Sequence, residues 1–389
     1  MQFSEKNIVL AKSKQKMIVI IVLVGLVAVV VGLGIFSYLF SNRCFASYEV
    51  NSTIDRSDSN NVDYLYYEGN MLKYSRSGIS EIDNEGKSLW NGGYEMKQPQ
   101  VDTCGDYVIV ADIGGKEVHI YNGKDEGTSI ETSLPIVRAK VASQGVVAVL
   151  LEDKDSNVLN IYNPYSTAET LLVEIPTNVS EEGYPLDFDI SPDGKSVVTS
   201  HMVVKGSSVE NKVSFYNFSK VGQDKNTLVG GKSFGEETIA KIEFVDEDEV
   251  ILFSEKGYVV FQEMRQPEIK LEKKFDEEIK SIAFDKDYVA VVTEKDGKQE
   301  NQKLFLYNSK GNEKLQRNIP YEYADMKIYG EEIIFVGNRS CNILRFNGKD
   351  KFKHEFEQEI DALFPTSNRE VYTLIDSSTI QQITLRKGD

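Results

Sequence analysis

The sequence is poor in the residue types on which many catalytic and metal sites depend. Its 389 residues include only 3 Cys, 3 His and 1 Trp. Three cysteines exclude a scaffold held together by disulfides, and no Cys-x-x-Cys pair is present to form a redox motif. The histidines at 119, 201 and 354 are too far apart to form a His-x-His or His-x-x-x-His metal pair. We therefore expect neither a bound metal nor a cofactor.

Motifs of catalytic nucleophiles are also missing. The chain has no Gly-x-Ser-x-Gly sequence and no added α/β domain to carry a catalytic triad. Asp83, Gly86 and Trp90 do not have the spacing of a sialidase Asp box, and we interpret Trp90 as a core aromatic residue. The segment 153–157 lacks the Gly and bidentate Glu of a calcium loop, so we interpret it as a hairpin turn. The sequence accordingly assigns no catalytic, cofactor-binding or metal-binding residue.

Proline and positive charge are scarce as well. Nine Pro stand against 20 Tyr, 19 Phe and many Val and Ile, a composition that favours strands over helices. A hydrophobic content of 41% excludes a largely disordered chain. The 44 Lys and Arg residues are outnumbered by 61 Asp and Glu, which gives a net charge of −17. This charge disfavours nucleic acids and anionic lipid headgroups as partners.

One long uncharged run, residues 17–40, predicts a transmembrane helix. A helix of this length spans roughly 36 Å, enough to cross a hydrocarbon layer of ~30 Å. Residues 1–16 contain four Lys and one Glu, so the positive-inside rule predicts a cytoplasmic tail. The run is longer than the core of a cleavable signal peptide, and we expect it to be retained as a single-pass anchor. Residues 41–46 then form a juxtamembrane linker, and the remaining chain lies outside the cytoplasm.

The rest of the chain contains a repeated segment. An alternating apolar strand ends in an aromatic residue, followed by Asn and a polar turn, and eight copies recur in steps of 38 to 54 residues. This spacing is close to the period of four-stranded propeller blades. We interpret the Asn as a turn residue because its side chain bonds to nearby main chain. The clear copies are His119–Asp125, Asn160–Ser166, Ser214–Lys220, Phe305–Gly311 and Leu344–Asp350, and the degenerate ones are Ser80–Gly86, Val259–Met264 and Gln382–Gly388.

These repeats predict an all-β, eight-bladed β-propeller over residues 47–389. Each unit has apolar inner strands and a more polar outermost strand, as a radial sheet requires. The last copy ends near Asp389 with no room for a fourth strand, while Ser47–Ile54 precedes the first unit. We therefore expect Ser47–Ile54 to close the eighth blade. Seven blades are the alternative if a degenerate copy is not a blade, whereas a β-sandwich does not need eight similar steps.

Two segments resemble known propeller repeats. Ile190–Lys195 resembles the turn of TolB- and YVTN-type repeats, and Ile82–Trp90 resembles a quinoprotein-type repeat. Taken with the Lys-rich tail, the single span and the acidic eight-unit region, the chain resembles an uncharacterised Gram-positive family of membrane-anchored propellers, known as a domain of unknown function. This resemblance implies a propeller fold and carries no catalytic residue across.

We therefore expect a non-enzymatic interaction or ligand-binding module of the cell envelope. Its expected partners are the membrane, through the anchor, and an envelope protein or glycan, but not nucleic acid. Binding is expected at the channel mouth or at loops that join strands of successive blades. The alternative is an envelope glycan-active enzyme, a lyase or hydrolase, with two carboxylates about 5–9.5 Å apart at the propeller channel. A sensory domain is a third option, although a tail of sixteen residues leaves little cytoplasmic chain to receive a signal.

Overall fold

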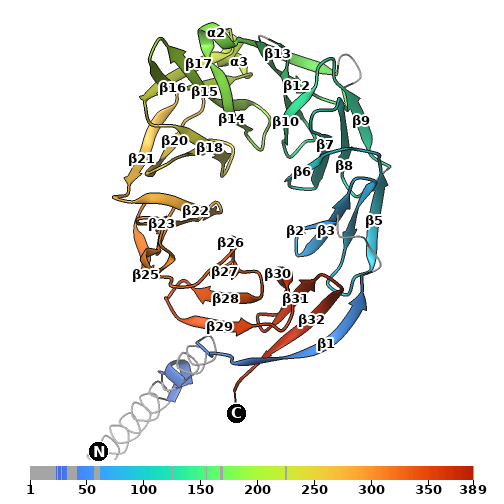
Figure 1. The fold of residues 1–389 in the computed structure, drawn as a ribbon, viewed down its shortest axis with the longest axis vertical. Coiled ribbons are helices and arrows are strands. Elements are labelled where there is room, and N and C mark those ends of the chain that lie inside the picture. Colours follow the sequence, from blue (N-terminus) through green and yellow to red (C-terminus); the bar gives the residue numbers. More distant parts are fainter. Residues whose placement is uncertain are drawn as a thin grey trace, which may run out of the picture.

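The protein forms a ring of eight four-stranded antiparallel sheets around a central opening (Figure 1). The computed structural model describes residues 42–56, 62–124, 126–154, 156–166, 170–223 and 226–388, with eight positions between 23 and 32. The predicted eight-bladed propeller is confirmed, and the seven-bladed alternative is wrong.

Seven blades are each made of four consecutive strands, ordered from the channel outwards. Blades 1 to 3 are β2 (Asp63–Tyr67), β3 (Asn70–Ser75), β4 (Gly78–Ile82) and β5 (Ser88–Gly93); β6 (Pro99–Cys104), β7 (Tyr107–Asp112), β8 (Glu117–Tyr121) and β9 (Thr128–Glu131); and β10 (Ile136–Val141), β11 (Val147–Glu152), β12 (Ser156–Tyr162) and β13 (Leu171–Asn178). Blades 4 and 5 are β14 (Tyr184–Ile190), β15 (Ser196–Lys205), β16 (Ser208–Asn217) and β17 (Leu228–Gly235); and β18 (Ile239–Phe244), β19 (Glu249–Ser254), β20 (Gly257–Gln262) and β21 (Glu268–Lys274).

Blades 6 and 7 follow the same order. They are β22 (Glu278–Phe284), β23 (Tyr288–Glu294), β24 (Lys303–Asn308) and β25 (Glu313–Asn318); and β26 (Asp325–Tyr329), β27 (Glu332–Val336), β28 (Ser340–Arg345) and β29 (Asp350–Glu355). Three helical turns lie in the connections: α2 (Val179–Glu182), α3 (Lys220–Gln223) and η1 (Gln299–Asn301).

The eighth blade joins the two ends of the chain. Its inner strands are β30 (Ile360–Pro365), β31 (Val371–Asp376) and β32 (Thr379–Arg386), and its outermost strand is β1 (Ser47–Asp55). β1 pairs antiparallel with β32 from Ser47 opposite Arg386 to Asp55 opposite Thr379. The outermost strand therefore lies where the sequence predicts the closing strand, and it covers an edge of β32 that would otherwise be open.

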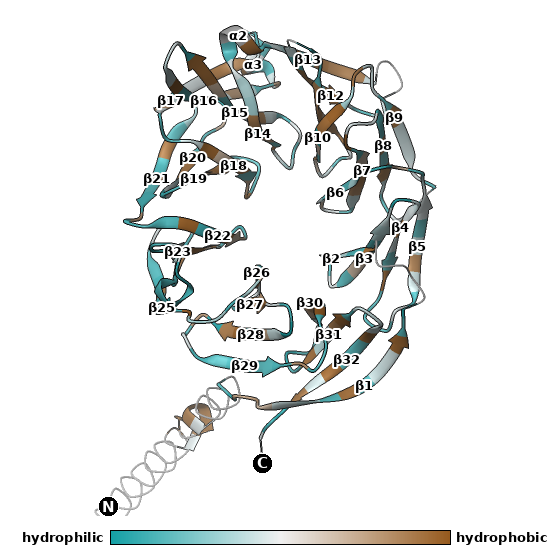
Figure 2. Ribbon diagram, viewed as in Figure 1, coloured by the Kyte–Doolittle hydropathy of each residue, from teal (hydrophilic) through white to brown (hydrophobic). Residues whose placement is uncertain are grey.

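The hydrophobic core is divided among the junctions between blades. Eight clusters of buried apolar side chains are found, and each lies between two neighbouring sheets. Figure 2 shows the same gradient, with hydrophobic inner strands and outer strands of mixed or hydrophilic character. The gradient arises because an inner strand packs on both neighbouring blades, whereas an outermost strand faces water.

The recurrent Asn after the third strand is a turn residue, as predicted. In each of the five clear copies its side-chain oxygen accepts the main-chain N–H two residues later, at 2.9–3.2 Å. This Asx turn starts the connection to the outermost strand. The five residues are Asn122, Asn163, Asn217, Asn308 and Asn347.

The predicted tail at 1–16 and transmembrane helix at 17–40 lie outside the described residues, apart from eight helical positions with exposed side chains. Within the described part of the chain, no helix is both long and apolar enough to cross a bilayer. Residues 42–46, part of the predicted linker at 41–46, lie against blade 7. Phe45 is buried, and its N–H donates to the Lys351 carbonyl at 2.8 Å. The apolar side chain of Phe45 thus extends the core between blades 7 and 8.

The closing strand can be tested by comparing two of its side chains. Tyr48 packs edge-on to His354, with ring centroids 5.1 Å apart, whereas Val50 is 43% exposed. We expect Tyr48→Ala to lower the free energy of unfolding by about 2 kcal/mol, less than a fully buried aromatic would lose. Val50→Ala should change it by less than about 0.5 kcal/mol. Urea denaturation measures both values, and equal losses in the two variants would contradict the assigned packing of β1.

Candidate functional site

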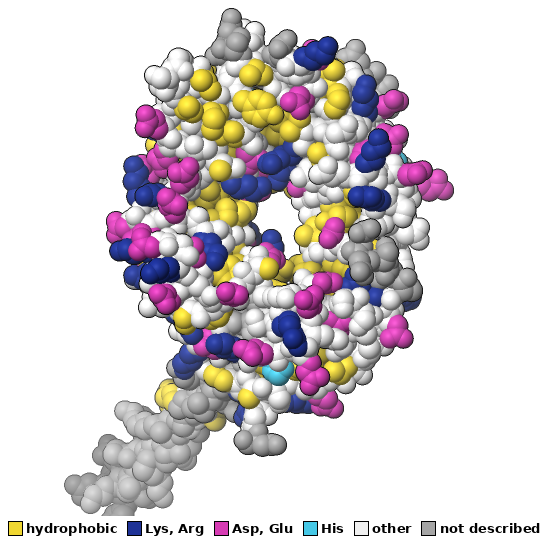
Figure 3. Space-filling model, in the orientation of Figure 1, with side chains coloured by type: hydrophobic (Ala, Val, Ile, Leu, Met, Phe, Trp, Pro, Cys, Tyr) yellow, Lys and Arg dark blue, Asp and Glu magenta, His cyan; other side chains and the backbone are white. Residues whose placement is uncertain are grey.

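Charged side chains gather on one side of the central channel, on the innermost strands of blades 2 to 5. Lys140 of β10 lies among carboxylates from three other blades. Its Nζ atom is 3.4 Å from Asp102, 3.6 Å from Asp189 and 3.4 Å from Glu243. Figure 3 shows basic side chains at one rim of the opening. One largely buried ammonium group therefore links four blades.

Aspartates on these innermost strands also accept hydrogen bonds from main-chain N–H groups of the next blade. An innermost strand has no strand neighbour on its channel edge, so its N–H groups need other acceptors. Arg138 pairs with Asp187, one of these acids. Three aspartates accept hydrogen bonds from main-chain N–H groups of innermost strands. Asp102 accepts from Val141 at 2.9 Å, Asp187 from Ile242 at 2.7 Å and Asp189 from Phe244 at 2.7 Å. These bonds join blade 2 to blade 3 and blade 4 to blade 5.

Burial shifts the protonation equilibria of the cluster. Desolvation raises the pKa of Asp189 to about 7 and also raises the pKa of Asp102. Desolvation alone would raise the pKa of Glu243, but the charges of Lys140 and Lys241 have the larger effect, so its pKa is lowered. Desolvation of Lys140 is likewise outweighed by the surrounding carboxylates, so its pKa is raised. Lys140 therefore stays charged while Asp189 becomes protonated near neutral pH.

The channel thus contains the clustered carboxylates that the enzymatic alternative requires, but they are already engaged. Asp102, Asp189 and Glu243 all contact Lys140, and the two aspartates also hold main-chain N–H groups. A general acid or base has to exchange a proton with a substrate, which here would disturb contacts between blades. The arrangement favours a clamp between blades over a catalytic pair.

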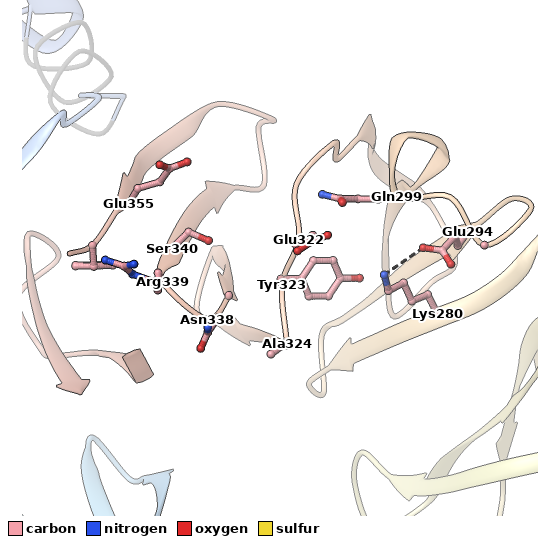
Figure 4. A pocket seen from close by; sticks show the side chains of 13 residues that line it. Lys280, Glu294, Gln299, Glu322, Tyr323, Ala324, Asn338, Arg339, Ser340 and Glu355 are labelled. Carbon is pink, nitrogen blue, oxygen red and sulfur yellow. Dashed lines mark hydrogen bonds and ion pairs between the residues drawn. The ribbon is translucent and has the colours of Figure 1, made fainter. Parts of the chain in front are cut away.

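A cleft of about 830 Å³ opens between blades 6 and 7 (Figure 4). It is bounded by the β23–β24 hairpin, the crossover from β25 to β26 and the β27–β28 hairpin, together with the end of β29. These loops lie on one face of the ring. They include a connection between successive blades, the kind of loop at which the sequence predicts binding.

The cleft presents charges of both signs. Lys280 and Glu294 form an ion pair at 3.1 Å, drawn as a dashed line in Figure 4. Among the described residues, no ion-pair partner is found for Glu322, Arg339 or Glu355, all three of which are exposed. Unpaired charges at a shared cleft provide specific contacts for a charged partner.

Of the residues singled out in the sequence, Cys341 and His354 line a smaller cavity beside the cleft, whereas the others lie apart from it. His119, His201 and His354 lie in blades 2, 4 and 7. Cys104 and Cys341 lie in blades 2 and 7 and are both free. In the resolved segments, no group of three or more His, Cys, Asp or Glu residues is arranged to hold a metal ion.

Two local predictions agree with the structure. Trp90 stacks on Tyr121 with ring centroids 5.5 Å apart and packs against the core between blades 1 and 2, although it is only partly buried. Asp153 and Lys154 lie between β11 and β12, where Asp153 N–H donates to the Ser156 carbonyl as in a hairpin turn. Sequence reasoning missed the residues around Lys140 and those of the cleft, because neither group has a local motif.

The raised pKa of Asp189 predicts how stability depends on pH. The folded protein binds a proton at Asp189 more tightly than the unfolded chain, so stability should fall as pH rises from about 4 to 7. We expect Asp189→Asn to flatten this fall and to raise Tm at pH 8 relative to the wild type. Asp106→Asn, at an exposed ion pair with Lys124, is the matched control and should keep the wild-type slope. An unchanged slope in Asp189→Asn, measured by thermal unfolding at pH 5–8, would contradict this assignment.

Comparisons with known proteins agree with the fold. The crystal structure of BamB from Moraxella catarrhalis matches with a TM-score of 0.53 and 12% identity, covering 87% of this chain and 100% of that chain. A crystal structure of a eukaryotic initiation factor matches with a TM-score of 0.54 and 14% identity, covering 88% of each chain. At these identities the likeness concerns the fold alone, and no curated protein matches the sequence. The model of a family of unknown function, DUF5711, matches residues 41–385, and the chain therefore belongs to this family.

Proposed function

We propose that the protein is a single-pass membrane protein whose propeller lies outside the cytoplasm and serves as a protein-interaction module of the cell envelope. The observation that carries this proposal is the cleft between blades 6 and 7, where loops of two blades present unpaired charges at an open cavity. An interaction module needs such a rigidly supported and chemically specific surface. The engaged carboxylates of the channel give the glycan-active alternative less support.

The position of the N-terminal segment relative to the cleft fits a tethered module. Asn42 accepts a hydrogen bond from the side chain of Asn347 at 2.7 Å, in the turn between β28 and β29. The cleft lies at the opposite end of the same blade, at the turn between β27 and β28. An anchor that approaches through Asn42 would therefore leave the cleft facing away from the membrane.

The membrane anchor itself is proposed from the apolar run at 17–40 and its Lys-rich flank. The described positions within this run are helical, and their large apolar side chains are 53–62% exposed. So many exposed apolar side chains close together in the sequence are unfavourable in water and favourable in a bilayer.

Cysteine labelling tests the proposed location. Cys44 is exposed, whereas burial raises the pKa of Cys104 to about 11 and that of Cys341 to about 12, which makes both thiols unreactive near neutral pH. We expect a membrane-impermeant maleimide to label the full chain in intact cells at pH 7.5. Cys44→Ser should abolish the labelling. If labelling requires cell lysis, the propeller lies on the cytoplasmic side and the proposal is wrong.

Photo-crosslinking tests the interaction face. A photoreactive residue in place of Arg339 stands in the cleft, and one in place of Lys286 stands in the exposed turn between β22 and β23, on the opposite face of the same pair of blades. We expect irradiation of cells to join one protein to the chain from position 339 and none from position 286. The crosslinked product is identified by mass spectrometry. Crosslinking from position 286 alone, or from neither position, would contradict the proposed face.

A further inference from the structure

A second cavity of about 330 Å³ lies beside the cleft, in blade 7. It shares Gln299, Glu322, Ser340 and Glu355 with the cleft, so the two spaces adjoin at these residues. The inner cavity is roofed by the crossover at 320–322 and has side chains of β27, β28 and β29 as its floor. A ligand in the cleft therefore lies next to the inner cavity.

Asn342 lines this inner cavity with an amide that has no partner. Its side chain is 3% exposed, and neither its Oδ1 nor its Nδ2 atom has a hydrogen-bond partner among the described residues. The hydroxyl of Tyr321, which lines the same cavity, is also buried and without a partner. Buried polar atoms are nearly always hydrogen-bonded, so this pair indicates a place where a polar group binds.

Strand register shows why the amide faces the cavity. Asn342 of β28 lies opposite Phe335 on β27 and opposite Lys353 on β29, and all three side chains lie on the face of the sheet towards blade 6. The rings of Tyr321 and Tyr323 pack edge-on against Phe335, with centroids 5.4 and 5.0 Å away. The crossover loop thus covers the row that contains Asn342.

The propeller repeat does not require an asparagine at this position. The residue five places before the turn Asn is exposed or half-buried in the other four clear copies, where it is Glu, Val or Lys. These residues are Glu117, Val158, Lys212 and Lys303. Blade 7 alone among these five combines a buried site with an amide, which points to a local role rather than to a need of the fold.

The surrounding chemistry fits a peptide better than a sugar. Sugars stack on bare aromatic faces, but the ring of Tyr321 lies 5.5 Å from Lys353 Nζ and the ring of Tyr323 lies 5.5 Å from Lys280 Nζ. Arg339 offers a positive charge, and Glu322 and Glu355 offer negative ones, at the cleft above. A peptide with charged side chains of both signs matches this distribution.

We propose that the cleft binds an extended peptide segment of the partner and that an Asn or Gln side chain of this segment enters the inner cavity and pairs with Asn342. One carboxamide can donate to Oδ1 and accept from Nδ2 of another, which satisfies both orphan atoms at once. Flanking charged residues of the peptide then meet Arg339 and Glu355 on blade 7 and Glu322 on the crossover loop. The inference rests on the proposed interaction function and names the chemistry that the cleft selects.

Peptide selection on the full chain in lipid nanodiscs tests this inference. The first probe is a phage library of random heptapeptides, and the second is the enriched heptapeptide made with a fluorescent label. We expect the enriched sequences to share an Asn or Gln with charged neighbours. Replacing that residue by Leu in the labelled peptide should weaken binding at least tenfold, as measured by fluorescence anisotropy.

Two variants separate binding from folding. Asn342→Leu should weaken binding of the labelled peptide at least tenfold, yet raise Tm without peptide, because an apolar side chain of similar size replaces an unpaired amide. Val158→Leu, at the equivalent position of blade 3, should leave both values near those of the wild type. A lower Tm in Asn342→Leu without peptide would mean that the amide is already satisfied, and it would overturn the inference.

The remaining outcomes distinguish the two proposals. If no peptide is enriched, or if enriched peptides bind Asn342→Leu as tightly as the wild type, the peptide inference is wrong. If the tetramer of N-acetylglucosamine binds in place of peptides, the cleft recognises glycan. If peptide selection fails while crosslinking at position 339 still captures a protein, the interaction function stands and only the carboxamide contact is lost. If both fail, both proposals are wrong.

Discussion

The ring depends on the pairing of β1 with β32. Each of its apolar clusters lies between two sheets, so every blade needs both neighbours, and the last junction forms only when the two ends of the chain meet. Phe45 extends this join by packing into the core of blades 7 and 8. The segment that leads to the proposed anchor is therefore part of the ring. It attaches to the end of blade 7 that lies opposite to the cleft.

The ring uses charge differently on its two sides. Around Lys140, the carboxylates of Asp102, Asp189 and Glu243 form ion pairs that join blades 2 to 5. The two aspartates also accept hydrogen bonds from main-chain N–H groups that have no strand partner. Between blades 6 and 7, Glu322, Arg339 and Glu355 have no ion-pair partner within the resolved segments. The first arrangement holds blades together, and the second leaves charges available for the recognition that we propose. A partner can thus bind at the cleft without disturbing the clamp.

Features with a local signal could be predicted from the sequence. The repeat period, the strand left over at 47–54 and the turn Asn residues each depend on a few neighbouring residues. The contacts of Lys140 could not be predicted, because Asp102 and Glu243 lie 38 and 103 residues away in the chain. The burial of Asn342 depends on a crossover loop whose path follows from packing against Phe335. Phe45 was missed because a single apolar residue next to a membrane run gives no strand pattern.

The most direct test of this account is hydrogen exchange of the full chain, alone and with the partner captured through the cleft. We expect β1 and β32 to be protected to the same extent with and without the partner, since they close one sheet. Binding should slow exchange at 322–324 and 337–340, the loops of the cleft. Rapid exchange throughout β1, or slowing confined to the turns on the opposite face, would contradict the account.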